Sequence, residues 1–253
     1  MKLVRRSSHF ILFLYRTFEL AESLGNKRKK DEKSSFVICG WGEEYGRIKS
    51  IQIEDGITNV SNNAFIGMTS TDSVSLPNSV TQIGGDAFTN CTQLSSLKMS
   101  QNLKVIATSA FQATSKLTSI DLPEGLEEVN IYSNPFNQSG VTSIVIPDSL
   151  FNSGKFGTSL LTYSNITTVY CSKEKQKQCD DYIEAVKATG NAKEGLKYET
   201  YEKYGNSYLY GGKFYSSLGD IGTTNHIKKR IYTVEEANKV SHPTGNRISI
   251  TYR

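Results

Sequence analysis

Apolar residues in the middle of the chain recur with a period of about 23 residues. The clearest marker is an Ala-Phe pair, which occupies residues 64–65, 87–88 and 110–111. Each pair closes a unit whose opening carries apolar residues at relative positions 0, 3 and 5. The last two of these point to the same side of a strand, because side chains alternate along a strand. Each opening therefore predicts a short strand with one apolar face.

The unit is repeated with few departures. Openings with the full spacing are Ile48/Ile51/Ile53, Leu94/Leu97/Met99, Leu117/Ile120/Leu122 and Val141/Ile144/Ile146. Polar Thr71 occupies the first position of the second opening, and Ser100 replaces the proline that follows other openings. In the fourth unit a Pro-Phe pair ending at Phe136 comes two residues late. This delay predicts a small insertion between residues 130 and 134.

A repeat of this length indicates stacked coils. A lone unit cannot bury its own apolar face, whereas stacked units bury one another's, so such arrays need three or more copies. We therefore expect the repeated phenylalanines to fill the space between coils, and these are Phe65, Phe88, Phe111 and Phe136.

Two segments carry a family resemblance: VSLPNSVTQIGGDAFTNCTQLSSLKM and LTSIDLPEGLEEV. They resemble the BspA-like leucine-rich repeat, and the resemblance covers about residues 45–171. It implies a strand-dominated leucine-rich repeat solenoid of about five units, in the α/β horseshoe class. It also implies a protein of the cell surface or a secreted protein, with a role in adhesion and protein–protein contact.

Side chains between the apolar positions of each opening are expected to point outward onto a sheet. One outward row runs through Gln52, Ser75, Lys98, Asp121, Val145 and Tyr170. Gln52, Lys98, Asp121 and Tyr170 are the candidate binding residues. Two interpretations stay open. The row and its flanking Ser and Thr residues form a hydrogen-bonding surface for a protein or glycan, or they only solubilise a strand face that favours Thr.

The region after the repeats, 172–253, predicts a small α+β appendage. Residues 172–190 have the spacing of an amphipathic helix that would cover the open end of the solenoid. Gly211-Gly212 predicts the turn of a hairpin within residues 208–215. A short helix from Thr233 to about Val240 and a strand through residues 248–252 would follow. Six tyrosines between residues 198 and 215 form either a stacking platform for sugars or bases, or a small tyrosine-rich sheet.

The four cysteines, at positions 39, 91, 171 and 179, include no CxxC motif. This argues against a zinc or thioredoxin-type site. Cys91 occupies a core position of the repeat. Cys171 and Cys179 are the candidate disulfide, which would imply an oxidising compartment.

Charge and motifs exclude several classes of function. Residues 48–150 carry four Lys and nine acids, which is a charge of −5, so the net charge of +4 leaves +9 for the rest of the chain. A nucleic-acid-binding protein would place its basic patch on the folded body, which here is acidic. The sequence contains three His and neither HExxH, GxSxG nor a Walker motif. It therefore predicts no enzyme, no metal and no cofactor.

Residues 1–44 are expected to be a leader or linker, poorly structured or a short helix. Their apolar run, Phe10–Tyr15, is shorter than the 7–15 or so residues of a secretory signal core and the 20 or so of a membrane span. The resemblance favours the cell surface or secretion, and a cytoplasmic location is the alternative.

The function expected from these features is a monomeric, non-enzymatic binding or adhesion module whose partner is a protein or glycan on another cell or matrix. One alternative is glycan binding or a minor hydrolytic role in the tyrosine-rich region. Another is a truncated copy without a present partner.

Overall fold

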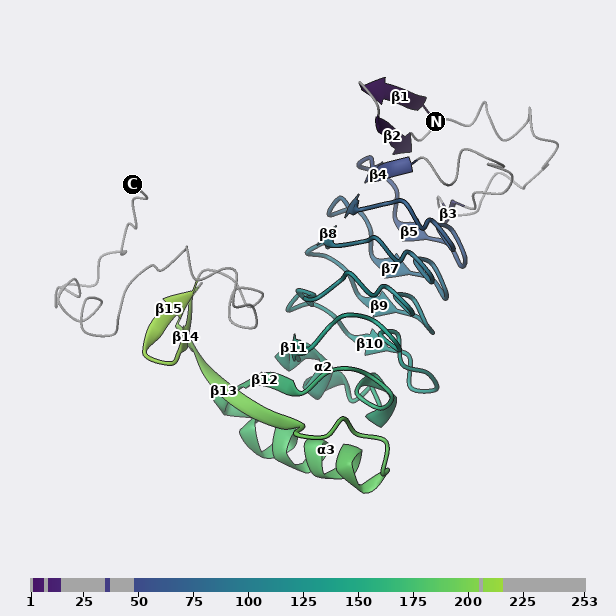
Figure 1. Cartoon of the computed structure of the whole chain (residues 1–253). Helices are drawn as coiled ribbons and strands as arrows, with labels where there is room; N and C mark the ends of the chain where they lie inside the picture. Colours follow the sequence, from purple (N-terminus) through teal and green to yellow (C-terminus); the bar gives the residue numbers. More distant parts are fainter. Residues whose placement is uncertain (1, 7–8, 15–34, 37–47, 205–206, 216–253) are drawn as a thin grey trace, which may run out of the picture.

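The computed structural model describes residues 2–6, 9–14, 35–36, 48–204 and 207–215, with side chains described from residue 48 onward. The predicted helix after Thr233, the strand at 248–252 and Cys39 lie outside these residues. The repeats form a solenoid whose successive coils lie on one another, as Figure 1 shows. This confirms the predicted leucine-rich repeat solenoid.

One side of the solenoid is a mostly parallel sheet, whose last three strands come from the unit openings. Its strand order is β1 (Lys2–Arg6), β2 (His9–Leu14), β4 (Ile48–Ile53), β6 (Ser73–Ser75) and β8 (Ser96–Lys98). In β4, β6 and β8 the equivalent apolar residues Ile51, Val74 and Leu97 lie opposite one another. The 23-residue period thus sets the register of the sheet.

The segment expected to be a poorly structured leader or a short helix has strands in its described parts. β2 pairs in parallel with β4, and β1 pairs antiparallel with β2. An edge strand exposes unpaired backbone N–H and C=O groups, and a neighbouring apolar segment satisfies them by adding a strand. The run Phe10–Leu14 supplies that strand to the edge of β4.

The other side of the solenoid is a second parallel sheet of two-residue strands. Its order is β10 (Glu128–Val129), β9 (Val105–Ile106), β7 (Gln82–Ile83), β5 (Asn59–Val60) and β3 (Ser35–Phe36). Each of the first coils therefore contributes one strand to each sheet, and the apolar core lies between the two sheets.

The repeated phenylalanines form a continuous stack inside the solenoid. Ring centroids are 5.2 Å apart from Phe65 to Phe88, 5.4 Å from Phe88 to Phe111 and 5.8 Å from Phe111 to Phe136. All four side chains are at most 1% exposed. The backbone N–H of each of the first three donates to the residue before the next phenylalanine, and all three bonds are 2.8 Å long.

Polar residues at core positions of the repeat are satisfied by the neighbouring coil. The hydroxyl of Thr71 donates to the carbonyl of Ile48 at 2.9 Å, and that of Ser100 donates to Val80 at 2.6 Å. A buried hydroxyl without a partner would cost roughly 1–3 kcal/mol. These hydrogen bonds explain why departures from the apolar pattern leave the stack intact.

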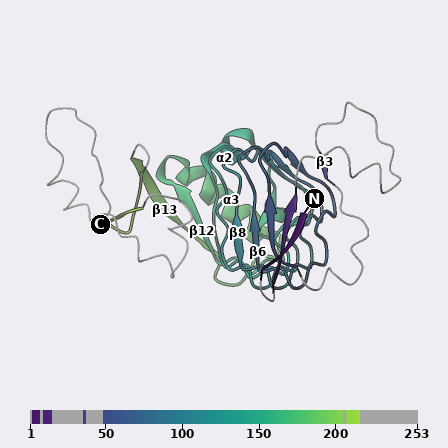
Figure 2. The same ribbon diagram turned by 90° about the horizontal axis from the view of Figure 1, so that it is seen from above.

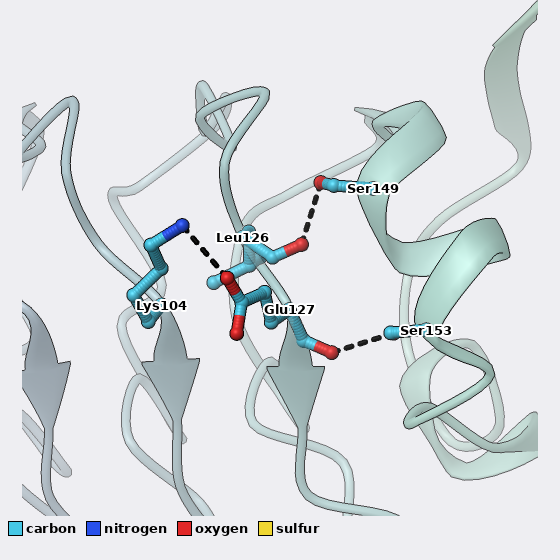
Figure 3. Close-up of polar contacts among 5 residues, drawn as sticks. All are labelled: Lys104, Leu126, Glu127, Ser149 and Ser153. Carbon is cyan, nitrogen blue, oxygen red and sulfur yellow. Dashed lines mark hydrogen bonds and ion pairs between the residues drawn. The ribbon is translucent and has the colours of Figure 1, made fainter.

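The edge of the second sheet is covered by a helix that the sequence pattern does not predict. Helix α2 (Asp148–Ser153) lies beside β10. The hydroxyls of Ser149 and Ser153 donate to the carbonyls of Leu126 and Glu127, each at 2.6 Å, as Figure 3 shows. The Glu127 side chain accepts a 2.7 Å bond from Lys104 on the opposite side. The Ser153 hydroxyl thus occupies the Glu127 carbonyl, whose counterpart one coil earlier, that of Lys104, accepts backbone N–H groups of the next coil.

A third sheet begins in the last repeats and continues into the chain that follows them. Its order is β11 (Ser143–Val145), β12 (Thr168–Ser172), β13 (Lys197–Tyr204), β14 (Ser207–Tyr210) and β15 (Lys213–Tyr215). The first three strands are parallel and the last two are antiparallel. Gly211 and Gly212, with φ of 55° and 74°, form the predicted hairpin turn, since two positive φ values suit glycine.

Helix α3 (Gln176–Ala188) follows β12 and precedes β13 along the chain. It covers the end of the stack, as Figure 1 shows. The short 3₁₀ helices η2 (Thr158–Leu160) and η3 (Lys173–Lys175) precede it. Its buried side chains are Cys179, Ile183 and Val186, which belong to the same core as the repeats. A helix thus lies within residues 172–190, where the spacing predicts one, and the described part of the appendage holds this helix and strands β13–β15.

Cys171 and Cys179 are free, buried thiols. The structure therefore does not contain the disulfide considered for this pair. A hydrogen bond between the two thiols and burial raise the pKa of Cys179. Cys91 is also free and donates to the carbonyl of Phe65, and burial raises its pKa to about 12. The apolar core thus accommodates all three cysteines, which pack as small hydrophobic groups.

Alkylation at pH 8 is expected to leave Cys91, Cys171 and Cys179 largely unlabelled in the folded protein, because all three are buried. The raised pKa values of Cys91 and Cys179 also disfavour their reactive thiolates. Unfolding in guanidinium without a reductant should allow complete labelling, which peptide mass spectrometry measures. If Cys171 and Cys179 stayed unlabelled after unfolding, they would be joined by a disulfide.

Candidate binding face

Two polar rows run across the outer side of the first sheet. Gln52, Ser75 and Lys98 lie directly opposite one another in β4, β6 and β8, and so do Ser50, Ser73 and Ser96. We call these six residues the first-sheet face. Gln52, Lys98 and Ser96 are exposed, and the other three are half-buried. Since neighbouring strands lie about 4.8 Å apart, Gln52 and Lys98 are separated by about 10 Å.

The first-sheet face offers one cation, one amide and several hydroxyls on a hydrogen-bonded sheet. These groups donate and accept hydrogen bonds but lack nucleophile–base or metal-ligand pairings. In the part of the chain that the structure describes, no three His, Cys, Asp or Glu side chains could hold a metal ion. The face is therefore suited to non-covalent recognition.

The predicted six-residue outward row is interrupted at Asp121. No strand is present at residues 117–122, so the first sheet ends at β8 and the third begins at β11. Asp121 is half-buried. The third sheet reaches this coil, since Lys203 Nζ of β13 lies 3.8 Å from Glu124 Oε1. Asp121 thus lies in the coil between the two sheets, outside the paired strands that hold Gln52 and Lys98.

Val145 and Tyr170 also differ from the predicted exposed row, because the C-terminal strands cover them. Val145 is 2% exposed and packs in a second cluster that we call the tyrosine cluster. Its members are Tyr170, Tyr201, Tyr208, Tyr210 and Tyr215. An outward position in the repeat is therefore not an exposed one where another strand pair packs over it.

Within the tyrosine cluster the rings meet edge to face. The Tyr170 and Tyr210 centroids are 5.3 Å apart at 86°, and those of Tyr201 and Tyr208 are 5.7 Å apart at 82°. Aromatic pairs prefer this arrangement, in which one ring's edge contacts the face of another. Ring faces used in this way are not open to a sugar, which favours the interpretation of these tyrosines as a small packed sheet.

Glu199 lies beside the tyrosine cluster and accepts hydrogen bonds from two residues, Lys197 and Tyr210. Its Oε1 accepts a 2.6 Å bond from Lys197, and its Oε2 accepts one from the Tyr210 hydroxyl. These two donors hold the pKa of Glu199 below its usual range. Burial, followed by the hydrogen bond to Glu199, raises the pKa of Tyr210. Tyr170 is half-buried against the Tyr210 ring. Gln52 and Lys98 are the exposed members of the four predicted site residues.

Comparison with known protein families identifies the same repeats. The model of the BspA type leucine-rich repeat region matches residues 43–174 with six copies, which is more than half of the chain. The chain belongs to the BspA-type leucine-rich repeat family. Repeat proteins of this family and fold are generally non-enzymatic, and a protein-binding role is compatible with them.

Solved leucine-rich repeat proteins are similar to this chain. A leucine-rich repeat protein of T. pallidum is 21% identical with a TM-score of 0.44, over 67% of each chain. One from Eubacterium ventriosum is 26% identical with a TM-score of 0.47, over 53% of this chain and 34% of that one. A leucine-rich cell surface protein from Faecalibacterium prausnitzii is 19% identical with a TM-score of 0.36, over 66% of this chain and 44% of that one.

The chain spans only about a third of the length of the E. ventriosum protein and under half of the F. prausnitzii one. No curated protein matches it. Among the helices that the structure describes, none is long and apolar enough to cross a membrane.

Proposed function

We propose that this BspA-type protein is a non-enzymatic protein-binding module that uses the first-sheet face. The observation that carries the proposal is the register of Gln52, Ser75 and Lys98 on three paired strands. Because the coils below share one buried core, these side chains are held on a rigid support. A preorganised surface loses less conformational entropy on binding than a flexible loop.

The proposal includes a cell-surface or secreted location and a partner on another cell or matrix. Surface association is typical of the family and supports this part. A protein partner is favoured over a glycan because the first-sheet face is polar and two-dimensional, with no aromatic ring among its six residues. Sugar sites commonly depend on stacking against such rings, which here pack against one another in the tyrosine cluster.

Capture of a partner from cell-surface extracts tests the face. The double variant Gln52→Ala/Lys98→Glu removes its amide and reverses its cation. We expect it to recover at least about tenfold less partner than the wild-type chain, as loss of a charged hydrogen bond costs about 1.5–3 kcal/mol. Asp121 and Tyr170 stay unchanged, because neither belongs to the first-sheet face. Tyr170 also packs in the tyrosine cluster, so its loss would confound binding with stability.

A matched double variant, Gln82→Ala/Lys116→Glu, makes the same chemical changes outside the face. Gln82 is exposed on β7 of the second sheet, and Lys116 is exposed in a turn. It should recover the partner as the wild type does. Equal recovery by the two double variants would reject the first-sheet face as the binding surface.

A further inference from the structure

The strand ladder on the first-sheet side of the solenoid is interrupted at the fourth coil. The first sheet ends at β8 of the third coil, and the third sheet begins at β11 of the fifth coil. Residues 117–122 lie between them and form no strand, and we call them the break. Ladders join the first three coils on this side, β4 with β6 and β6 with β8. The fourth coil therefore lacks the strand pairing that fixes the coils before it.

The opposite side of the fourth coil is joined to the third coil without interruption. Strand β10 pairs with β9, and the carbonyl of Lys104 accepts two backbone N–H groups of the fourth coil at 2.9 Å each. The corner that carries the phenylalanine stack has two further backbone bonds, both 2.8 Å long, from Phe111 N to Pro135 O and from Ala113 N to Asn137 O. The fourth coil is thus held by backbone hydrogen bonds along its second-sheet side and its corner.

Side-chain packing also changes at the break. Leu97 of β8 is half-buried, whereas its equivalents Ile51 and Val74 in the earlier strands are 1% and 3% exposed. The spacing of 5.8 Å from Phe111 to Phe136 is the longest of the three in the phenylalanine stack. Leu97 still packs against the common core. On the first-sheet side, apolar packing therefore holds the third and fourth coils together where a ladder joins the earlier ones.

Apolar packing and a strand ladder resist motion differently. Hydrogen bonds of a ladder are directional and weaken steeply when they are misaligned, whereas hydrophobic contact is non-directional. Hinges between rigid bodies are a few residues in loops or at the ends of elements that absorb changes in backbone dihedral angles. A junction with a ladder on one side and apolar packing on the other can therefore rotate about its ladder side.

The elements after the repeats are attached to the fourth coil beyond the break. Ser149 and Ser153 of α2 donate to carbonyls at positions 126 and 127. Lys203 of β13 lies 3.8 Å from Glu124, two residues after the break. These contacts unite the rest of the fourth coil, α2 and the third sheet into one body.

We infer that the break is a hinge, about which the first three coils rotate relative to the body that follows it. The second sheet and the phenylalanine corner form the pivot, and the first-sheet side opens and closes. This rotation changes the angle between the first-sheet face and the third sheet. The inference goes beyond the proposed function, because it concerns motion within the chain and holds whether or not the first-sheet face binds a partner.

Double electron–electron resonance between two nitroxide labels on the full chain tests the hinge. Labelled p-acetylphenylalanine in place of Gln52 and Lys213 gives a pair that spans the break. The same label in place of Asn152 and Lys213 gives a control pair within one body, and all three side chains are exposed. Local motion of β15 contributes to both pairs, since they share Lys213. The hinge predicts a distance distribution at least about twofold wider for the spanning pair.

A reversible cross-link provides the matched control. Oxidation of the double variant Ser95→Cys/Thr118→Cys joins the third and fourth coils across the break, at the roughly 4.8 Å spacing of neighbouring strands that a disulfide can bridge. Asp72→Cys/Ser95→Cys places the same bond one coil earlier, where the ladder is complete, and all three positions are exposed. The first disulfide should narrow the spanning distribution to the width of the control pair, and reduction should restore it. The second disulfide should leave the width unchanged.

Two results would overturn the hinge. One is equal widths for the spanning and control pairs without any cross-link. The other is a wide spanning distribution that persists in the oxidised Ser95→Cys/Thr118→Cys variant, since the motion would then arise elsewhere in the chain.

Discussion

Replacing Phe88 with alanine should lower the free energy of unfolding by about 3–5 kcal/mol, the range found for buried aromatic truncations. Phe88 is fully buried and stacks between Phe65 at 5.2 Å and Phe111 at 5.4 Å. Truncation leaves a cavity in contact with two neighbouring coils. Neither coil can close it without shifting the backbone hydrogen bonds from Phe65 to Ala87 and from Phe88 to Ala110.

Urea unfolding followed by circular dichroism measures this effect, with Phe88→Leu as the matched control. Leucine keeps an apolar side chain in the stack and should cost about 1–1.5 kcal/mol. If Phe88→Ala were no less stable than Phe88→Leu, the coils would not depend on a shared aromatic stack.

Gly84→Ala should be nearly as damaging, although it adds a single methyl group. A Cβ at Gly84 would lie 2.5 Å from the backbone nitrogen of Asn62 and 2.7 Å from the carbonyl carbon of Ser61. Both atoms belong to the preceding coil, so relief requires moving one coil relative to the next. We expect a loss of about 2–3 kcal/mol, the upper part of the range for overpacked sites.

The adjacent Gly85 provides the control. Its added Cβ would come no closer than 3.4 Å to Thr108 O, and neither glycine has a positive φ. Gly85→Ala should therefore be neutral or slightly stabilising, since alanine reduces the entropy of the unfolded chain. Equal unfolding free energies for the two variants would contradict the close approach of the coils at Gly84.

Features set by the repeat period are predictable from the sequence. The period assigns Phe65, Phe88 and Phe111 to equivalent places, and every coil offers those side chains the same environment. The hairpin turn at Gly211-Gly212 is equally local, since its backbone angles favour glycine wherever the turn lies.

Features that depend on contacts distant in sequence are not predictable in this way. The repeat pattern marks Val145 as outward, yet Tyr201 and its neighbours cover it. Helix α2 has only one buried side chain, Leu150, and so shows no amphipathic period. It is held instead by two serine hydroxyls on carbonyls of the preceding coil.

The candidate site also has residues that the repeat period predicts and residues whose surroundings depend on contacts distant in sequence. Gln52 and Lys98 follow from the alternation of strand side chains and lie on the first-sheet face. Tyr170 follows from the same alternation, but it is half-buried because β13, β14 and β15 pack over it, and nothing in the repeat pattern indicates that contact. Figure 2 shows β13 on the side of the molecule where the first-sheet strands β6 and β8 also lie.

Site-specific photocrosslinking of partner to the folded chain tests the proposed binding face most directly. A photoreactive phenylalanine replaces Ser96, which is exposed on the first-sheet face, or Gln82, which is exposed on the second sheet. The proposed binding face predicts covalent partner adducts from position 96 and none from position 82. Adducts from position 82 alone, or in equal yield from both positions, would contradict it.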